Sequence, residues 1–522
     1  MSARQALWGL IALSTLLRLI WATALGPCQD EAYYSLFAVH LDWSYYDHPP
    51  LMALIEAAGL GLAGGVNSVL ALRLGFLALF VGSTLVMARL AARLYSPWAS
   101  FLAAFLLNVT AYYGIAAATL ALPDGPLVFF WLWTLDRLAA ALETPDRLRP
   151  WVWVGLAWGG ALLSKYHAVF LPIGAALYCV LEPSARCWLR RPGPYLALAL
   201  GLLAFTPVIA WNARHGWVSF AFQGERALGA GFRPDALLGA IIGPAMYLTP
   251  WIWAFLVAAL VRHARRFAAA APADRFLLCQ AIPPLLAFLL VACWRPVLPH
   301  WSLIGFLALL PLLGRDWAAW WEVDPAHLRR RLRWLAVVPV AGGLLFLGQA
   351  RWGLLQRTCA AIGLPAPGWD PTAETFGWDQ VARELDRRGL TNRPGTFLFT
   401  SKWYHSGQLA FALNHRAPVL CYNPRGAHHF AFWSRPEQWV GRDGILVVVN
   451  ESSTEPDMFD RWFHRIEPLG AFAVVRAGVP IWRVRLYHCV RQTRPFPYDR
   501  FLPHPTPQQV AYQRSLPNLR DR

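Results

Sequence analysis

Acidic side chains open and close the first polar segment of this 522-residue chain, PCQDEAYYSLFAVHLDWSYYDHPP. Asp30 and Glu31 stand near its start, and Asp47 and His48 stand near its end. The stretch 31–41 is expected to form a short amphipathic helix at a membrane surface, where Asp30 could act as a general base. Two structural alternatives stay open, namely Asp30 as a helix N-cap and Asp47–His48 as a local ion pair.

A second acid, Asp124, lies in the short segment ATLALPDGPLVFFW, between two apolar runs. A charge in such surroundings is costly and usually marks a site or a partner, which makes Asp124 a candidate site residue. Because Asp-Gly-Pro is also a good helix start, a capping role is the alternative.

Cations occur at similar places in the pattern. The chain has two lysines, Lys165 and Lys402, and Lys165 lies in LLSKYHAVFLP beside Tyr166. A compact ammonium group suits contact with a phosphate, although a lysine that snorkels to the membrane surface would look the same. Arg295 and His300 flank a proline-containing segment, and Arg295 is the second candidate for an anionic head group. Residues 212–235 could form a flap over these groups.

All of these segments adjoin apolar runs long enough to cross a bilayer as helices. Hydrophobic residues make up 57% of the chain and charged residues 15%, which indicates an integral membrane protein. The net charge of +17 comes largely from arginines between apolar runs, so nucleic acid is not an expected partner. We predict about eleven spans, near 6–25, 68–90, 98–118, 125–141, 150–163, 166–182, 194–211, 236–261, 276–293, 300–314 and 334–349.

The arginine-rich loops fall on one side of the membrane if the spans are counted in this way, and that side should be cytoplasmic. The other side then holds residues 26–67, the segments around Asp124 and Arg295, and everything after about residue 350. We therefore expect a transmembrane part over 1–350, with juxtamembrane helices in 26–67, and an extracytoplasmic part over 351–522.

Residues 351–522 show a different pattern. The segments GTFLFT, APVLCY, GILVVVN, AFAVVRA and IWRVRLYHCV predict strands, and 376–389 predicts a helix. The expected fold is an α-helical polytopic membrane protein with a small mixed α/β domain and a polar tail from about residue 503. The eight cysteines show no metal-ligand spacing, and a disulfide among Cys359, Cys421 and Cys489 is one option for an extracytoplasmic domain.

Several of these segments together resemble a known family. Asp30-Glu31, YYDHPPL (45–51), PDGPL (123–127), LLSKY (162–166) and PHW (299–301) are similar to motifs of membrane glycosyltransferases of the C-type fold. The resemblance is to the bacterial group related to protein O-mannosyltransferases and to the lipid A aminoarabinose transferase. It covers roughly residues 1–350 and continues weakly at FGW (376–378) and WYHSGQLAFAL (403–413).

The resemblance implies transfer of a sugar, with inversion, from a polyprenyl-phosphate carrier to an extracytoplasmic acceptor at a bacterial inner membrane. It implies Asp30 as the base and Asp124 as the residue that orients a substrate. Where the aminoarabinose transferase has Glu-Lys-Pro-Pro, this chain has Asp47-His48-Pro49-Pro50, which leaves Lys165 and Arg295 as better phosphate candidates. The full set of expected substrate-binding residues is Glu31, Tyr33, Asp47, His48, Lys165, Tyr166, Arg295 and His300.

Two other classes of protein fit a polytopic chain with a few charges. A transporter or flippase would favour charged or broken helices near the bilayer midplane and an inverted repeat. A lipid-linked glycan ligase would carry long outer loops rich in arginine and histidine. Neither pattern is evident here, so we expect a transferase. The expected partners are a lipid-linked donor, a lipid, glycan or protein acceptor, and membrane lipids. No cofactor is expected, and a divalent metal has no support from spacing.

Overall fold

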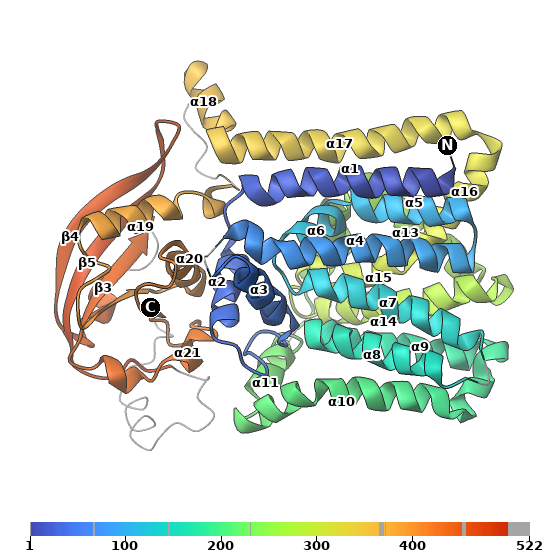
Figure 1. Ribbon diagram of the computed structural model, residues 1–522, viewed down its shortest axis with the longest axis horizontal. Coiled ribbons are helices and arrows are strands. Elements are labelled where there is room, and N and C mark those ends of the chain that lie inside the picture. The colour runs from blue at the N-terminus through green and yellow to red at the C-terminus, as the bar shows by residue number, and fades with distance from the viewer. Residues whose placement is uncertain are drawn as a thin grey trace.

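The computed structural model describes residues 2–65, 68–144, 147–229, 231–364, 370, 372–450 and 456–498. Figure 1 shows a bundle of roughly parallel helices, with the N-terminus at one end and a sheet domain at the other. The predicted polar tail from about residue 503 lies outside the described residues.

Six helices are long and apolar enough to cross a membrane. They are α1 (Ala3–Ala24), α4 (Val69–Leu94), α7 (Asp124–Leu142), α10 (Pro192–Arg214), α14 (Pro272–Ala292) and α17 (Pro325–Trp352). Four bent pairs of helices bring the number of candidate spans to as many as 10. The shorter helix α8 (Arg149–Ser164), at the predicted span 150–163, packs between α7 and α10. The expectation of a polytopic helical protein is confirmed, with spans that are more broken than predicted.

The bent pairs show where the chain departs from straight crossings. In the first, α5 (Pro97–Val109) meets the π-helix η1 (Tyr112–Ala116) and α6 (Ala117–Thr119) at 79°. In the second, η2 (Tyr166–Val169) and α9 (Phe170–Leu181) turn by 118° into η3 (Pro183–Arg190). In the last, η5 (Pro299–Trp301) and α15 (Leu303–Leu307) lead at 53° into α16 (Leu309–Val323).

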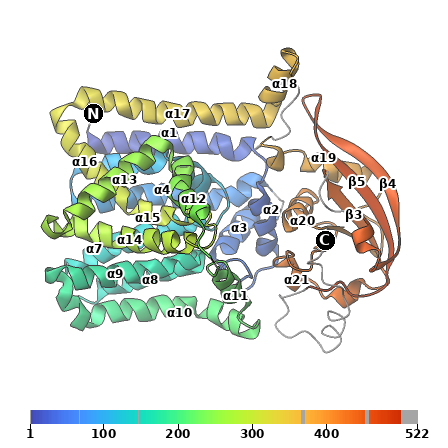
Figure 2. The same ribbon diagram turned by 180° about the vertical axis from the view of Figure 1, so that it is seen from behind.

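The predicted continuous span 236–261 is wrong. It consists of α12 (Pro234–Leu248) and α13 (Pro250–Arg265), which meet at 119°. Thr249 has φ of 67°, and a proline disfavours helical backbone in the residue before it. Pro250 therefore ends one helix and begins the next, and Figure 2 shows α12 running across the direction of the bundle.

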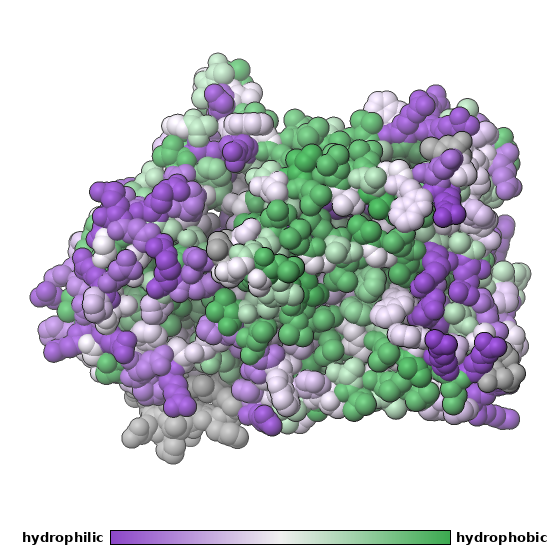
Figure 3. Space-filling view, in the orientation of Figure 1, coloured by the Kyte–Doolittle hydropathy of each residue, from purple (hydrophilic) through white to green (hydrophobic). Residues whose placement is uncertain are grey.

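Figure 3 shows a broad apolar band on this face of the bundle, between the polar sheet domain and a polar rim at the opposite end. The helices that end at this rim carry ion pairs such as Arg89–Asp136 and Arg93–Glu143. An apolar band of this kind, flanked by charge, is the surface of a multi-pass membrane protein.

The C-terminal domain contains a five-stranded sheet of order β2-β1-β3-β5-β4. Its strands are β1 (Thr396–Thr400), β2 (Val419–Cys421), β3 (Asp443–Val449), β4 (Phe463–Arg476) and β5 (Val479–Gln492). β1 lies parallel to β2 and β3, and β5 is antiparallel to β3 and β4. All five predicted strands are present, although β4 begins earlier than predicted, and the predicted helix is α19 (Trp378–Arg387).

Alternate residues of β1 face different cores, as the pleat of a strand requires. Leu398 packs with α19, whereas Phe397 and Phe399 join an aromatic core that continues into residues 26–67, called the first outer loop below. The sheet thus presents one face to α19 and the other toward the membrane part of the chain.

The first outer loop forms α2 (Gln29–Val39) and α3 (Leu51–Leu62), which lie between the bundle and the C-terminal domain (Figures 1 and 2). The expected interfacial helix is wrong, because the consecutive residues 31–37 of α2 are all buried, so the helix has no face left for a membrane surface over these two turns. The helix α20 (Trp403–Ala412), within the WYHSGQLAFAL segment, packs directly on it. A Cβ at Gly407 would lie 2.7 Å from the Tyr33 Cα, so this contact requires glycine.

The disulfide option for the C-terminal domain is wrong, since all three of its cysteines are free. Cys421 is on β2 and Cys489 is on β5, with β1 and β3 between them. Three strand spacings separate these two residues by about 14 Å, well beyond the reach of a disulfide.

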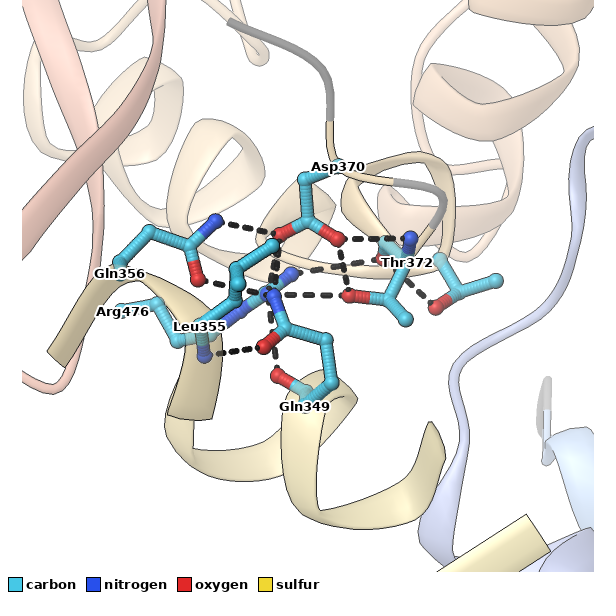
Figure 4. A network of polar contacts seen from close by, with 7 residues as sticks. Gln349, Leu355, Gln356, Asp370, Thr372 and Arg476 are labelled. Atoms are coloured by element: carbon cyan, nitrogen blue, oxygen red, sulfur yellow. Dashed lines mark hydrogen bonds and ion pairs between the residues drawn. The ribbon is translucent and has the colours of Figure 1, made fainter. Parts of the chain in front are cut away.

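A buried polar network fastens the sheet to the last long helix (Figure 4). The guanidinium group of Arg476, at the end of β4, donates to the backbone carbonyl of Gln349 in α17 and to the Asp370 carboxylate at 2.7 Å. Gln349 and Gln356, of α17 and α18 (Leu354–Ala361), both donate to the same carboxylate. A charge pair with this many hydrogen bonds fixes the domain on the bundle.

Candidate functional site

Asp30 lies in the first turn of α2 and is half-buried. The helix begins at Gln29 with Cys28 as its N-cap, so the capping alternative for Asp30 is wrong. Within the described part of the chain its carboxylate takes part in no hydrogen bond or ion pair. Burial, followed by the charges of Asp47 and Asp124, raises the pKa of Asp30 to about 6. A carboxylate with a raised pKa and free oxygens is suited to accept a proton.

This pKa predicts how a reaction that uses Asp30 as a base depends on pH. The base is active when ionised, so the rate should rise about tenfold per pH unit below pH 6 and level off near pH 7. Initial rates between pH 4.5 and 8 measure this limb, and the thermal midpoint at each pH shows whether the protein stays folded. A rate that is flat from pH 5 to 7 would contradict the assignment.

Glu31, next to Asp30, forms a fully buried ion pair with Arg73 of α4 at 2.6 Å. Its carboxylate also accepts from the backbone N–H groups of Cys28 and Ala121. Arg73 in turn donates to three carbonyls at the end of α1 and just beyond it, those of Ala22, Leu25 and Gly26. Because these partners occupy the carboxylate of Glu31, the structure gives this residue the role of joining α1, α2 and α4, in place of the expected contact with substrate.

Asp47 is buried and links the first loop to the C-terminal domain. One carboxylate oxygen accepts from the Tyr33 hydroxyl at 2.6 Å, and the other pairs with His428 Nδ1 at 2.5 Å. Burial alone would raise the pKa of Asp47, but His428 lowers it to about 2, so the carboxylate is ionised. The Tyr33 hydroxyl also accepts from the backbone N–H of His429, which adds a second contact between the first loop and the C-terminal domain.

The prediction of a local ion pair between Asp47 and His48 is wrong. His48 Nε2 lies 3.0 Å from the Tyr34 hydroxyl, and the carboxylate of Asp47 pairs with His428 instead. Burial, followed by the charge of Lys165, lowers the pKa of His48 to about 3, so its ring is neutral. The predicted flap is also present in part, because Gln223 of α11 (Val218–Glu225) donates to the backbone carbonyl of Asp47.

Asp124 and Lys165 are joined in a bidentate contact at 2.8 and 2.9 Å. Asp124 is the first residue of α7 and caps no backbone N–H, so the capping alternative is wrong. Lys165 is 5% exposed and lies at the start of η2, which excludes the snorkelling alternative. The Lys165 ammonium group, which was expected to be free for a phosphate, is therefore paired with Asp124. The charges of both residues act on the Asp30 carboxylate.

A small cavity beside this pair is lined by Asp124, Tyr112, His167 and His300, the last of which sequence analysis had proposed. His167 Nε2 is buried and has no hydrogen-bond partner among the described residues, and the Tyr112 hydroxyl lies beside the Asp124 carboxylate. A buried polar atom such as His167 Nε2 is costly unless something binds it. Tyr166 lies at the edge of the same region with its ring packed on Phe205 and Phe220.

Tyr112 belongs to the π-helix η1, and a buried arginine supports that element. Arg18 of α1 donates to the backbone carbonyl of Gly114 at 2.7 Å and to the Asn108 side chain at 2.9 Å. Its guanidinium also lies 4.4 Å from the centroid of the Phe80 ring. Short π-helical segments occur often at functional sites, and an arginine inside a membrane part is rare without a role.

The pair Asp124–Lys165 allows a test that separates structure from chemistry. Asp124→Asn and Lys165→Met each leave one buried charge without its partner and should each cost about 3 kcal/mol of stability. The double variant removes both charges and should recover most of that loss, yet stay inactive if the pair contacts substrate. Thermal midpoints and transfer rates of all four proteins decide this. An active double variant would show that the pair is structural.

Arg295 is exposed and donates to the backbone carbonyl of Leu228 at 2.7 Å. No contact within the described residues links it to Asp30, Asp124 or Asp47. Arg226, from the predicted flap, is better placed, because its guanidinium lies on the rings of Phe222 and Trp301 and its charge acts on His48. The phosphate candidate on this side of the site is therefore Arg226.

The structure also brings in residues that the sequence pattern did not single out. Tyr112 and His167 come from helix breaks, and His428 and His429 come from a turn of the C-terminal domain more than 380 positions after Tyr46. No periodicity or spacing connects such distant positions. The described residues contain no group of three or more histidine, cysteine or acidic side chains placed to hold a metal.

Comparison with known proteins supports the architecture. ArnT from Cupriavidus metallidurans, bound to undecaprenyl phosphate, superposes with a TM-score of 0.59 at 17% identity, over 92% of this chain and 97% of ArnT. The chain has the fold of ArnT. The apo state of the same protein matches with a TM-score of 0.57. The expected C-type fold is thereby confirmed. Because the match covers 92% of this chain, it includes most of the C-terminal domain.

Sequence comparisons point in the same direction. The family model for dolichyl-phosphate-mannose-protein mannosyltransferase matches residues 47–211, which hold Asp47, Asp124 and Lys165. The lipid A galacturonosyltransferase RgtD of Rhizobium johnstonii is 24% identical over 291 residues, or 53% of this chain. The match spans 58% of the length of RgtD.

Proposed function

We propose that this chain is a glycosyltransferase that moves a sugar from a polyprenyl-phosphate carrier to an acceptor, with inversion at the sugar carbon. Asp30 takes the proton from the acceptor hydroxyl, and that oxygen attacks the sugar carbon as the bond to the phosphate oxygen breaks. The leaving group is the polyprenyl phosphate. The observation that carries the proposal is the Asp30 carboxylate, which is half-buried, has no partner within the described residues, and has its pKa raised to about 6 by burial and by the charges of Asp47 and Asp124.

The surrounding charges fit the two substrates. A lipid phosphate gains negative charge on its bridging oxygen as it leaves, and cations fixed in a partly dry site stabilise that charge. Lys165 and Arg226 supply such cations, and Asp124 orients the ammonium group of Lys165. The likeness to ArnT, solved with undecaprenyl phosphate, supports a polyprenyl phosphate as the carrier.

The surface and the relatives support an acceptor and a location for this protein. RgtD is a lipid A galacturonosyltransferase, which supports lipid A or another lipopolysaccharide sugar as the acceptor here. The arginine-rich rim at the end opposite the C-terminal domain supports a bacterial inner membrane with that rim in the cytoplasm. The site then lies on the periplasmic face.

The test is release of polyprenyl phosphate. Purified protein in nanodiscs is supplied with undecaprenyl-phosphate sugars of several kinds and with extracted lipopolysaccharide, and the lipid products are followed by mass spectrometry. Release that depends on the acceptor, with a matching mass gain on the acceptor, is the expected result. An absence of release with every donor would reject the proposal. Addition of EDTA in parallel reports whether the reaction needs a divalent metal.

A further inference from the structure

A second cavity lies apart from Asp30, where three distant parts of the chain meet. His40 and Asp42 come from the first outer loop, Trp211 and His215 from the end of α10, and His429 and Trp433 from around α21 (Phe430–Trp433). The reaction proposed above uses none of these six side chains.

The walls of this cavity are ordered by their own contacts. Trp211 stacks on His215 with ring centroids 4.0 Å apart and an interplanar angle of 17°, and its Nε1 donates to the Asp42 carboxylate at 2.8 Å. His429 lies against both Trp211 and Trp433, and its Nδ1 accepts from the backbone N–H of Tyr46. The cavity is therefore preformed, as most small-molecule sites are.

Several polar atoms of the lining remain able to bind a ligand. Asp42 is exposed and its oxygens retain acceptor capacity beyond the bonds from Trp211 and the Trp43 backbone. Burial lowers the pKa of His429 to about 3, and partial loss of hydration lowers the pKa of the more exposed His40 as well, so both imidazoles are neutral near pH 7.

This chemistry discriminates between ligand classes. The lining has one carboxylate and, within the described part of the chain, neither lysine nor arginine, which disfavours a phosphate or an acidic sugar. Neutral imidazoles and a carboxylate suit hydroxyl groups, and the partly exposed indole of Trp433 suits the apolar face of a sugar ring.

The cavity also adjoins a surface suited to a membrane. Leu41, which also lines the cavity, is 54% exposed, and Val39, Trp43 and Trp217, which lie near lining residues in the chain, are exposed by 46%, 55% and 49%. Exposed tryptophans of this kind gather at the level of lipid head groups. A sugar that belongs to a membrane-anchored molecule would therefore reach the cavity directly.

We propose that this cavity binds a neutral sugar residue of the membrane-anchored acceptor, at a position remote from the hydroxyl that reacts. His429 connects it to the reaction site, because its backbone N–H bonds Tyr33 and its neighbour His428 pairs with Asp47. The role as an acceptor site rests on the proposed transferase function, whereas the binding of a neutral sugar does not.

Binding is measured first, by saturation-transfer NMR on the full chain in nanodiscs. The probe is methyl N-acetyl-β-glucosaminide, with methyl galacturonide and inorganic phosphate as anionic competitors. His40→Ala and Asp42→Asn, both at exposed positions, should reduce the signal at least fivefold. His464→Ala and Asp379→Asn, also at exposed positions, are the matched controls and should leave it unchanged. Equal signals in all variants, no signal in the wild type, or displacement by phosphate would overturn the inference.

Kinetics then separate this inference from the proposed function. His40→Ala and Asp42→Asn should raise the KM for the acceptor about tenfold and leave kcat and the KM for the donor unchanged. A wild type that binds the sugar but transfers nothing would keep the cavity as a sugar site and reject the transferase. Active variants with an unchanged acceptor KM would reject the acceptor site and keep the transferase.

Discussion

Asp30→Asn should reduce the release of polyprenyl phosphate by at least about a hundredfold, because positioned general bases contribute roughly 10²–10⁴ to a rate. The amide has nearly the same shape as the carboxylate but cannot accept the proton. Since Asp30 has no protein partner among the described residues, its replacement removes no structural contact, and the thermal midpoint should stay the same or rise. Both quantities are measured on the same preparation.

Two further variants sharpen this test. Asp457→Asn changes an exposed carboxylate of the C-terminal domain and should leave the rate unchanged. Asp30→Glu keeps the base but moves its oxygens, and should retain part of the activity together with the acidic limb of the pH profile. Normal turnover by Asp30→Asn would remove Asp30 as the base and make Asp47 the next candidate.

Glu31→Gln should have the largest effect on stability, although Glu31 is the immediate neighbour of Asp30. The change leaves the fully buried Arg73 guanidinium without its counter-charge, and breaking such a pair costs about 3–5 kcal/mol. Arg73 also donates to three backbone carbonyls, which keep part of its hydrogen bonding when Glu31 is replaced. The loss of stability should therefore lie toward the lower end of this range. The thermal midpoint, followed by the intrinsic tryptophan fluorescence, reports the change.

A comparison with an exposed ion pair tests whether burial causes this loss of stability. Asp379 and Arg383 form an ion pair on α19 with side chains 65% and 68% exposed, and Asp379→Asn should not move the midpoint measurably. The double variant Glu31→Met/Arg73→Met should be more stable than Glu31→Gln, because it leaves no lone charge. If Glu31→Gln unfolds at the wild-type temperature, the ion pair does not hold the first loop.

The membrane part could be predicted well where a single segment carries its own signal. The long helices follow from apolar runs, and Asp30, Asp124 and Lys165 stand out because a charge beside such runs is expensive. The break between α12 and α13 was missed, although a Thr-Pro step inside an apolar run is a local sign of it. The strands of the sheet followed from their composition and their flanking turns.

Pairing between segments could not be predicted. Nothing in the sequence shows that Lys165 is paired with Asp124, or that Asp47 is paired with His428 and not with the adjacent His48. The same holds for α2. Its sequence is compatible with a helix at a membrane surface, and only the packing of α20 on it shows that it is buried. These choices depend on how distant elements pack, and a single sequence carries no record of that packing.

The contacts between the C-terminal domain and the first outer loop have a consequence for the synthesis of the protein. Tyr46 and the His429 that it contacts are 383 positions apart, and translation at roughly 5–20 residues per second needs about 20–80 s to cover that distance. During this interval the loop lacks its cover, and the carboxylates of Asp30 and Asp47 are open to water. The reaction site is thus completed among the last events of synthesis, so a ribosome that stops before about residue 430 leaves an inserted bundle with an unfinished site.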